Sequence, residues 1–117
     1  MQIKTVHVVF GPLHLTNNWL IYSTLSNCTI VKCTDVVWCH KVDTTHYYNS
    51  VQMGKSFALK LYDNSKRILI LDCKNEQEAV AVMDLLSIKK PGILLGYNPK
   101  ILDLWNASPD NFIKAHS

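Results

Sequence analysis

The hydrophobic positions along the chain change their period once, close to Cys73. Before that point, apolar residues form short runs or alternate with polar ones, as in "SFALKLY", where Phe57, Leu59 and Leu61 lie on one side. After it, apolar residues recur three and four positions apart, at Ala79, Val82, Met83 and Leu86. Alternation is typical of a strand, and the longer spacing is typical of one face of a helix. The pattern therefore predicts a run of strands followed by one amphipathic helix.

Turn signals separate the strand-type segments. These segments are residues 3–10, 12–16, 19–24, 28–33, 35–42, 56–62 and 67–73. Asn17-Asn18 joins two of them and predicts a hairpin, because Asn tolerates the positive φ that tight turns require. Residues 44–56, "TTHYYNSVQMGKS", are mainly polar and predict a loop or a frayed strand edge. The last segment, "RILILDC", is apolar on both faces, which predicts a central strand or one covered by a helix.

Local signals define both ends of the predicted helix. Asn75 is a suitable N-cap, and Glu78 stands at the reciprocal position of a capping box. Pro91-Gly92 ends the helix. Two further pairs, Asn98-Pro99 and Ser108-Pro109, each place a proline at the first position of a short helix. The chain is therefore expected to end in a small helical tail.

The order of these elements predicts an α+β fold. We expect an antiparallel β-meander or sandwich of about six or seven strands, capped by one amphipathic helix and followed by a short helical C-terminal tail. The length of 117 residues suits a single domain, 1–117, with its core at about 12–88 and its tail at 91–117.

Composition and charge narrow the function classes. The chain is 48% hydrophobic and 18% charged, which is typical of a globular domain. The net charge is only +3 and the lysines are scattered, so nucleic-acid binding is disfavoured. No apolar run approaches the roughly 20 residues that span a bilayer. Lys89, Lys90 and Lys100 leave open an alternative role as a peripheral membrane-surface binding module.

The stretch "CTIVKCTDVVWCHKV" raises the question of a metal site, because it holds three of the four cysteines. These are Cys28, Cys33 and Cys39, with Cys73 further on. No pair has the C-x-x-C spacing of structural zinc sites, and the adjacent Cys39 and His40 leave a strand by opposite faces. His40 with Cys28 or Cys33 across strands stays open, but ordinary half-buried thiols are favoured, and no metal or cofactor is expected. Free thiols suit a cytoplasmic location, with the cytoplasmic face of the membrane as an alternative.

Two thiols are candidates for reactivity. Cys73 lies at the junction of a strand and the predicted helix, whose N-terminus is expected to lower the thiol pKa. Cys39 can react only if the fold brings it near a base such as His46 or His7. Either thiol supports an alternative function as a redox sensor or small enzyme. The sequence contains no glycine-rich phosphate loop and no G-x-S-x-G motif, so the main expectation is a protein that is not an enzyme.

Aromatic residues offer a candidate interaction surface. Trp38 and Trp105 are expected to pack in the core or beneath the tail. Tyr47-Tyr48 lies in the polar stretch beside His46, so His46, Tyr47 and Tyr48 are the expected exposed patch. This patch, or an exposed sheet edge, predicts binding of a protein or peptide.

Three stretches of the sequence resemble parts of one known family. The stretch "GKSFALKLYDNSKRILILDCKNEQEAVAVMDLL" is similar to the end of a pleckstrin-homology-like domain, where a hairpin with a polar turn precedes a capped helix that plugs a sandwich. "TIVKCTDVVWCHKV" resembles the middle of the bacterial members, in which a pattern close to "i-x-x-x-D-I-v-w" links two strands. "GILLGY" and the helix after it resemble the tail of small uncharacterised bacterial proteins with that fold. The resemblance covers roughly residues 15 to 105.

The resemblance implies a fold more firmly than a function. Pleckstrin-like folds host lipid, peptide and protein binding, and the fold alone does not choose among them. Members that bind phosphoinositides carry basic residues in the first hairpin turn, whereas the corresponding "LTNNW" has none. The leading expectation is a small bacterial module for protein or peptide interaction, or an accessory domain, and its oligomeric state is left open.

Overall fold

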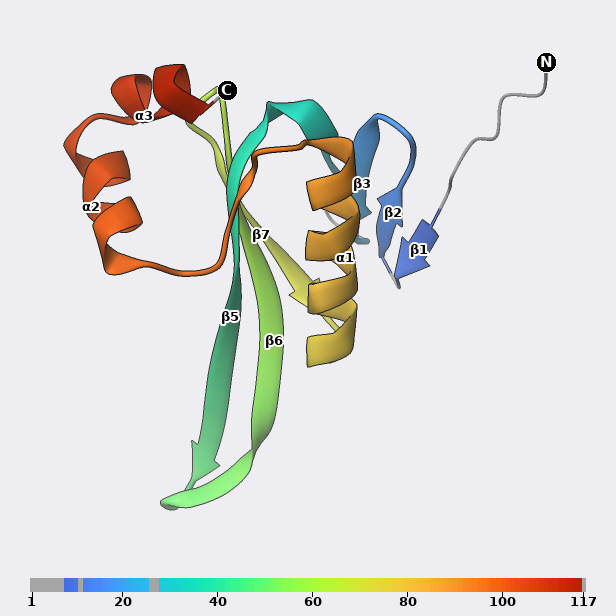
Figure 1. The fold of residues 1–117 in the computed structure, drawn as a ribbon. Coiled ribbons are helices and arrows are strands. Elements are labelled where there is room, and N and C mark those ends of the chain that lie inside the picture. Colours follow the sequence, from blue (N-terminus) through green and yellow to red (C-terminus); the bar gives the residue numbers. More distant parts are fainter. Residues whose placement is uncertain (1–7, 11, 26–27, 117) are drawn as a thin grey trace.

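The computed structural model describes residues 8–10, 12–25 and 28–116, and within them the chain forms two sheets and three helices (Figure 1). The first sheet is an antiparallel meander with the strand order β1-β2-β3-β4. Its strands are β1 (Val8–Phe10), β2 (Leu13–Leu15), β3 (Trp19–Ser23) and β4 (Cys28–Lys32). A short 3₁₀ turn, η1 (Cys33–Asp35), leads to the second sheet. The part of the opening segment before Val8 lies outside the described residues.

The second sheet contains the longest strands of the molecule and has the order β7-β6-β5-β8. Its strands are β5 (Val36–Tyr48), β6 (Val51–Asp63), β7 (Ile68–Cys73) and β8 (Leu94–Leu95). The first three form an antiparallel meander, and the two-residue β8 pairs parallel to β5. Together with the helices, these two sheets confirm the predicted α+β fold class.

The amphipathic helix α1 (Glu76–Lys89) begins and packs as its sequence predicts. The Asn75 side chain accepts a hydrogen bond of 2.9 Å from the backbone N–H of Glu78. The Glu78 carboxylate accepts one from the N–H of Lys74, one residue before the cap. The buried face of α1 contacts the leucines of both sheets, and the cluster includes Leu15, Leu20, Leu59, Leu61, Leu71, Ala79, Val82 and Leu86. This cluster is the main core of the fold.

The C-terminal helices α2 (Pro99–Ala107) and α3 (Pro109–His116) pack on a second, separate hydrophobic cluster. Trp38 is fully buried there and stacks on Tyr62, with ring centroids 4.2 Å apart. Trp105 and Phe112 of the two helices cover this pair. The expectation that Trp38 and Trp105 pack in the core or beneath the tail is confirmed.

A bulge at the start of β5 sends neighbouring residues into the two different clusters. Val36 pairs with Asp63 and Trp38 with Tyr62, so Val37 is the extra residue. Val36 belongs to the main core, whereas Val37 and Trp38 belong to the tail cluster. Strict alternation along this strand would place Val36 and Trp38 on one face, and the bulge separates them. From Trp38 onward the side chains alternate between the two faces.

Residues 44–56 form neither of the predicted alternatives, a loop or a frayed strand edge. They are the outer part of a long β5–β6 hairpin that extends past the end of α1 (Figure 1). Asn49 and Ser50 have φ angles of 49° and 64°, and a turn with two positive φ angles matches the twist of antiparallel strands. Asn17 and Asn18 form the predicted hairpin turn between β2 and β3, but without positive φ. We call residues 43–56 the arm.

Strand β7 lies at the edge of its sheet. Its apolar sequence predicted either a central strand or a strand covered by a helix, and the central position is wrong. One face is covered as expected, because Leu71 is buried in the core with α1. On the other face Ile68 and Ile70 are 46% and 62% exposed. An apolar strand therefore has one open face and one open edge.

Replacing Trp105 by alanine should lower the free energy of unfolding by about 3–5 kcal/mol, the usual cost of removing a large aromatic side chain from a core. The control is Trp19→Ala, because Trp19 is 46% exposed and surface changes usually stay within about 0.5 kcal/mol. Urea denaturation followed by circular dichroism measures both. Equal effects of the two substitutions would contradict the packing of α2 on the second sheet.

Candidate functional site

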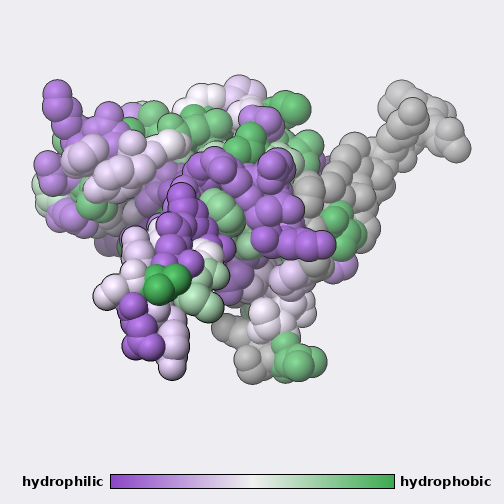
Figure 2. Space-filling view, turned by 90° about the horizontal axis from the view of Figure 1, so that it is seen from below, coloured by the Kyte–Doolittle hydropathy of each residue, from purple (hydrophilic) through white to green (hydrophobic). Residues whose placement is uncertain are grey.

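The arm carries the most exposed group of large apolar and aromatic side chains on the second sheet. Tyr47 and Tyr48 are 67% and 68% exposed, and Val51 and Met53 are 60% and 65% exposed. Figure 2 looks from below, the side to which the arm points, and shows hydrophobic atoms among hydrophilic ones over this end of the molecule. Tyrosine and methionine are enriched where proteins contact other proteins.

The predicted trio His46, Tyr47 and Tyr48 is exposed but divided between two faces. Strand β5 alternates without interruption from Trp38 to Tyr48, since the second bulge leaves out Met53 of β6. His46 and Tyr48 therefore share the face of Trp38 and the tail helices, and Tyr47 lies on the α1 face. His46 Nε2 is 2.8 Å from Ser56 Oγ, which fixes the imidazole along the arm.

The outer edge of β5 is unpaired over most of its length. Strand β8 pairs only with Trp38 and Cys39, and the backbone N–H of Gly96 donates the last bond to the Cys39 carbonyl at 3.0 Å. Beyond it, residues 40–48 have no strand neighbour on that side within the described part of the chain. We call residues 40–48 the free edge. By alternation, the backbone N–H and C=O groups of Lys41, Asp43, Thr45 and Tyr47 point outward along it.

A groove lies at the body end of the free edge, where β8 stops. Its volume is about 440 Å³, and it is lined by His40, Lys41, Val42, Asp43, Lys60 and Tyr97. The rings of His40 and Tyr97 meet edge to face with centroids 5.4 Å apart. Lys60 Nζ lies 5.6 Å from the ring centre of Tyr62 behind the groove. The groove therefore combines aromatic walls with two lysines, Lys41 and Lys60, and one aspartate, Asp43.

His40 is the buried polar residue of this groove. Only 4% of it is exposed, and its Nε2 lies 3.1 Å from the hydroxyl of Tyr62. Burial lowers the pKa of His40 below its ordinary value, the Lys41 carbonyl acts in the opposite sense, and the charge of Lys60 lowers the pKa further. The imidazole is therefore neutral at physiological pH and serves as a hydrogen-bonding wall.

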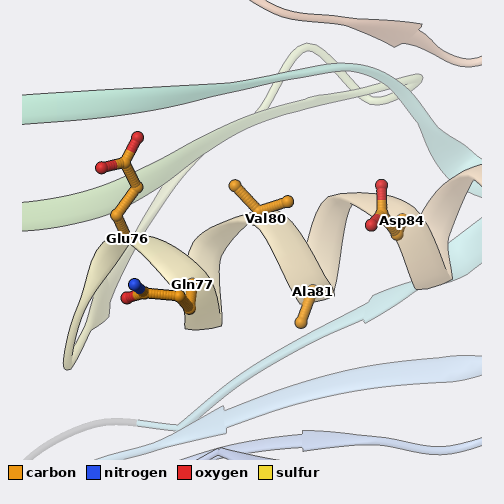
Figure 3. A pocket seen from close by; sticks show the side chains of 5 residues that line it. All are labelled: Glu76, Gln77, Val80, Ala81 and Asp84. Atoms are coloured by element: carbon orange, nitrogen blue, oxygen red, sulfur yellow. The ribbon is translucent and has the colours of Figure 1, made fainter.

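The α1 side of the second sheet carries more carboxylates than the groove. Lys41 forms an ion pair with Glu76 of α1, and Asp43 lies 3.8 Å from the same ammonium. A shallow hollow of about 380 Å³ follows the exposed face of α1 and is lined by Glu76, Gln77, Val80, Ala81 and Asp84 (Figure 3). Its side chains all come from one helix, and Glu76 is already paired with Lys41.

The two candidate thiols are held in their protonated form. Cys39 is fully buried, and burial raises its pKa to about 12. Burial also raises the pKa of Cys73 to about 11, with further contributions from the negative charges of Glu78 and Asp72. This direction is opposite to the lowering expected from the helix N-terminus. His46, one of the bases considered for Cys39, lies on the arm and bonds with Ser56 instead.

Other sequence candidates are distributed over the molecule. Lys89 Nζ donates to the carbonyl of Asn17 and Lys90 Nζ to that of Thr34, so both hold loops of the body. The described residues contain no group of three or more His, Cys, Asp or Glu side chains placed to bind a metal. Among the same residues, no helix is long and apolar enough to cross a membrane.

Sequence reasoning named an exposed sheet edge without locating it, and it missed the groove and the exposure of Val51 and Met53 beside the tyrosines. The pair Asn49-Ser50 between "HYY" and "VQM" was an available hairpin signal for the arm. The groove had no local signal, because Tyr97 meets His40 only through the parallel pairing of β8 with β5.

Comparison with known protein families gives a match. A family model described as a domain of unknown function, DUF6709, matches residues 5–104. The matched range includes both sheets, the arm, the free edge and the groove. No curated protein matches the chain.

Iodoacetamide should modify Cys28 well before Cys39 and Cys73, because Cys28 is exposed and the thiolate is the reactive form. With a pKa of about 11, Cys73 is ionised in only about one molecule in ten thousand at neutral pH. Its modification rate should rise steadily as the pH is raised toward that pKa. Mass spectrometry of digested samples measures each site. Rapid modification of Cys73 at neutral pH would contradict its raised pKa.

The lowered pKa of His40 should make the protein less stable in acid. The unfolded chain binds a proton at this residue more readily than the folded chain, so stability rises with pH in this range. The contribution of His40 is present above its unfolded value of 6.5 and is lost as the pH falls below 6.5 toward the folded pKa.

The measurement for His40 compares denaturation of the wild type and His40→Gln at several pH values. The stability advantage of the wild type should shrink, or reverse, between about pH 7 and pH 5. A constant difference between the two proteins across this range would show that His40 titrates at the same pH in both states.

Proposed function

Because the chain belongs to the DUF6709 family of domains of unknown function, its role has to come from its own surface, and we propose that it is a non-enzymatic module that binds a protein or peptide through the arm. The observation that carries this proposal is the exposure of four large side chains at one end of a single hairpin. Tyr47, Tyr48, Val51 and Met53 are each at least 60% exposed. Contiguous apolar exposure of this kind marks interaction sites.

The shape of the arm also supports binding. It has two open faces with different side chains, and an unpaired backbone along the free edge. Open edges bind extended peptides by main-chain hydrogen bonds, while side chains on alternate positions select the sequence. The body holds the arm rigidly at its base, because Trp38 and Tyr62 are stacked and buried there.

A pleckstrin-homology-like identity for the fold, in a bacterial family, is part of the same proposal. A four-stranded meander, a three-stranded meander and a helix that directly follows the last hairpin support it. The polar turn between β6 and β7 is held by Asp63, whose carboxylate accepts from the backbone N–H groups of Ser65 and Arg67. Such folds commonly serve as binding modules.

The alternatives have weaker support. A thiol enzyme or redox sensor needs a thiolate, whereas the pKa values of Cys39 and Cys73 are both raised. A membrane-surface module needs free cations, whereas Lys89 and Lys90 already bind loop carbonyls. A cytoplasmic location remains part of the proposal on the basis of the four free cysteines.

Selection from a displayed library of random peptides, with the immobilised chain as bait, tests the proposal. The wild type should enrich a recurring peptide motif, and Tyr47→Ala/Tyr48→Ala should weaken binding of those peptides about thirtyfold or more, as at interface hot spots. The matched control is Trp19→Ala, an exposed aromatic of the other sheet, which should bind as the wild type does. Peptides that bind the double variant unchanged would refute a role of the arm.

A further inference from the structure

We propose that the arm binds a second copy of this chain, by antiparallel pairing of the two β5 free edges about a twofold axis at Thr44. The inference rests on the proposed function and names the partner of the same surface. In this dimer the two second sheets join into one continuous sheet, and the two bodies lie at opposite ends of the paired arms. Such an interface is isologous: the same surface is used twice.

The length of the free edge selects the register. The pairing of β8 with β5 ends at Cys39, and the hairpin turn begins at Asn49. Nine residues of β5 lie between them, 40–48, which is roughly 30 Å of strand. The antiparallel pairing that uses all nine is centred on Thr44. It aligns Lys41 with Tyr47 of the second copy and Asp43 with Thr45 of the second copy. These residues carry the outward backbone groups, so the pairing forms about eight hydrogen bonds.

The groove and the exposed tyrosine are complementary in this register. Tyr48 of one copy lies opposite His40 of the other, on the same face of the joined sheet. His40 lines the groove beside Tyr97, and the groove volume of about 440 Å³ accommodates an aromatic side chain. The ring of Tyr48 in each copy therefore enters the groove beside His40 in the other copy. A twofold axis forms this contact twice.

The charges agree with the same register. Residues 44–54 contain no Lys, Arg, Asp or Glu, so two arms approach without repulsion although each chain has a net charge of +3. Lys41 faces an aromatic ring and Asp43 faces a hydroxyl. A twofold axis at Asp43 would place two aspartates directly opposite each other, which is unfavourable. An axis at Val42 would align Thr45 of the second copy with Cys39, whose edge β8 already occupies.

An engineered disulfide tests the register directly. In the dimer, Thr44 lies opposite Thr44 of the second copy in a non-hydrogen-bonded pair. The Cα atoms of such a pair are about 4.5 Å apart, which is within the range that disulfides span. In a Cys28→Ser/Cys73→Ser background, which leaves only the fully buried Cys33 and Cys39, Thr44→Cys should form a covalent dimer on mild oxidation. Thr45→Cys, one residue away on the other face, is the matched control and should form no disulfide-linked dimer.

Sedimentation over a concentration series tests the interface without a disulfide. The wild type should dimerise reversibly. Thr45→Pro removes one outward N–H of the free edge without removing a β5–β6 bond and should yield a monomer with an unchanged circular dichroism spectrum. Tyr97→Ala lies outside the arm and should weaken dimerisation about tenfold or more by opening the groove. Leu104→Ala, another exposed residue of the tail region, is its control.

The possible outcomes separate this inference from the proposed function. A wild type that stays monomeric at every concentration overturns the dimer, as does a dimer that is indifferent to Thr45→Pro and Tyr97→Ala. If that monomeric chain still enriches peptides that need Tyr47 and Tyr48, the proposed function stands with a different partner. If the dimer forms as described, the selected peptides should compete with it for the free edge.

Discussion

The burial of Trp38 is the interaction on which the rest of this structure depends. Its ring stacks on Tyr62, its Nε1–H donates to the carbonyl of Gly96 at 2.9 Å, and the tail helices cover it. The indole thus joins the start of β5 to the residue that follows β8, 58 residues away in the sequence. Because the tail is anchored at Trp38, it covers the base of the second sheet and leaves the outer part of β5 uncovered. The position of one side chain therefore determines where the closed body ends and the open hairpin begins.

The β5 sequence records this division. From Val36 to Cys39 every residue is fully buried. The bulge at Val37 places Val36 and Cys39 in the main core, and Val37 and Trp38 in the tail cluster. A strand covered on both faces is apolar without interruption. From Lys41 onward half-buried and exposed residues mix, and the last three, His46 to Tyr48, are all exposed. One strand is thus a core element in its first third and a surface element in its last, and the ion pair of Lys41 with Glu76 lies at the transition.

Much of the fold was predictable because its signals are local. The period of three and four residues identified α1, the Asn75 side chain caps that helix as predicted, and α2 begins at Pro99 as predicted. The arm was not predicted, because a hairpin exposed on both faces needs no apolar period and resembles a loop. The edge position of β7 was not predicted either, because its sequence is apolar on both faces although Ile70 is exposed. The candidate site depended on distant pairing, and the Cys73 pKa on burial and two carboxylates that outweigh the helix N-terminus.

The backbone at Gly96 has a consequence for how such a surface evolves. Its φ of 90° is accessible to glycine and strained for other residues, and it turns the chain away from β5 after two residues of pairing. A tail that stayed extended here would lengthen β8 and cover the strand beside it, one residue at a time. The accessible length of the hairpin edge is therefore encoded in a segment about fifty residues away from it in the sequence. Lineages can open or close this edge through the tail while every arm side chain stays the same.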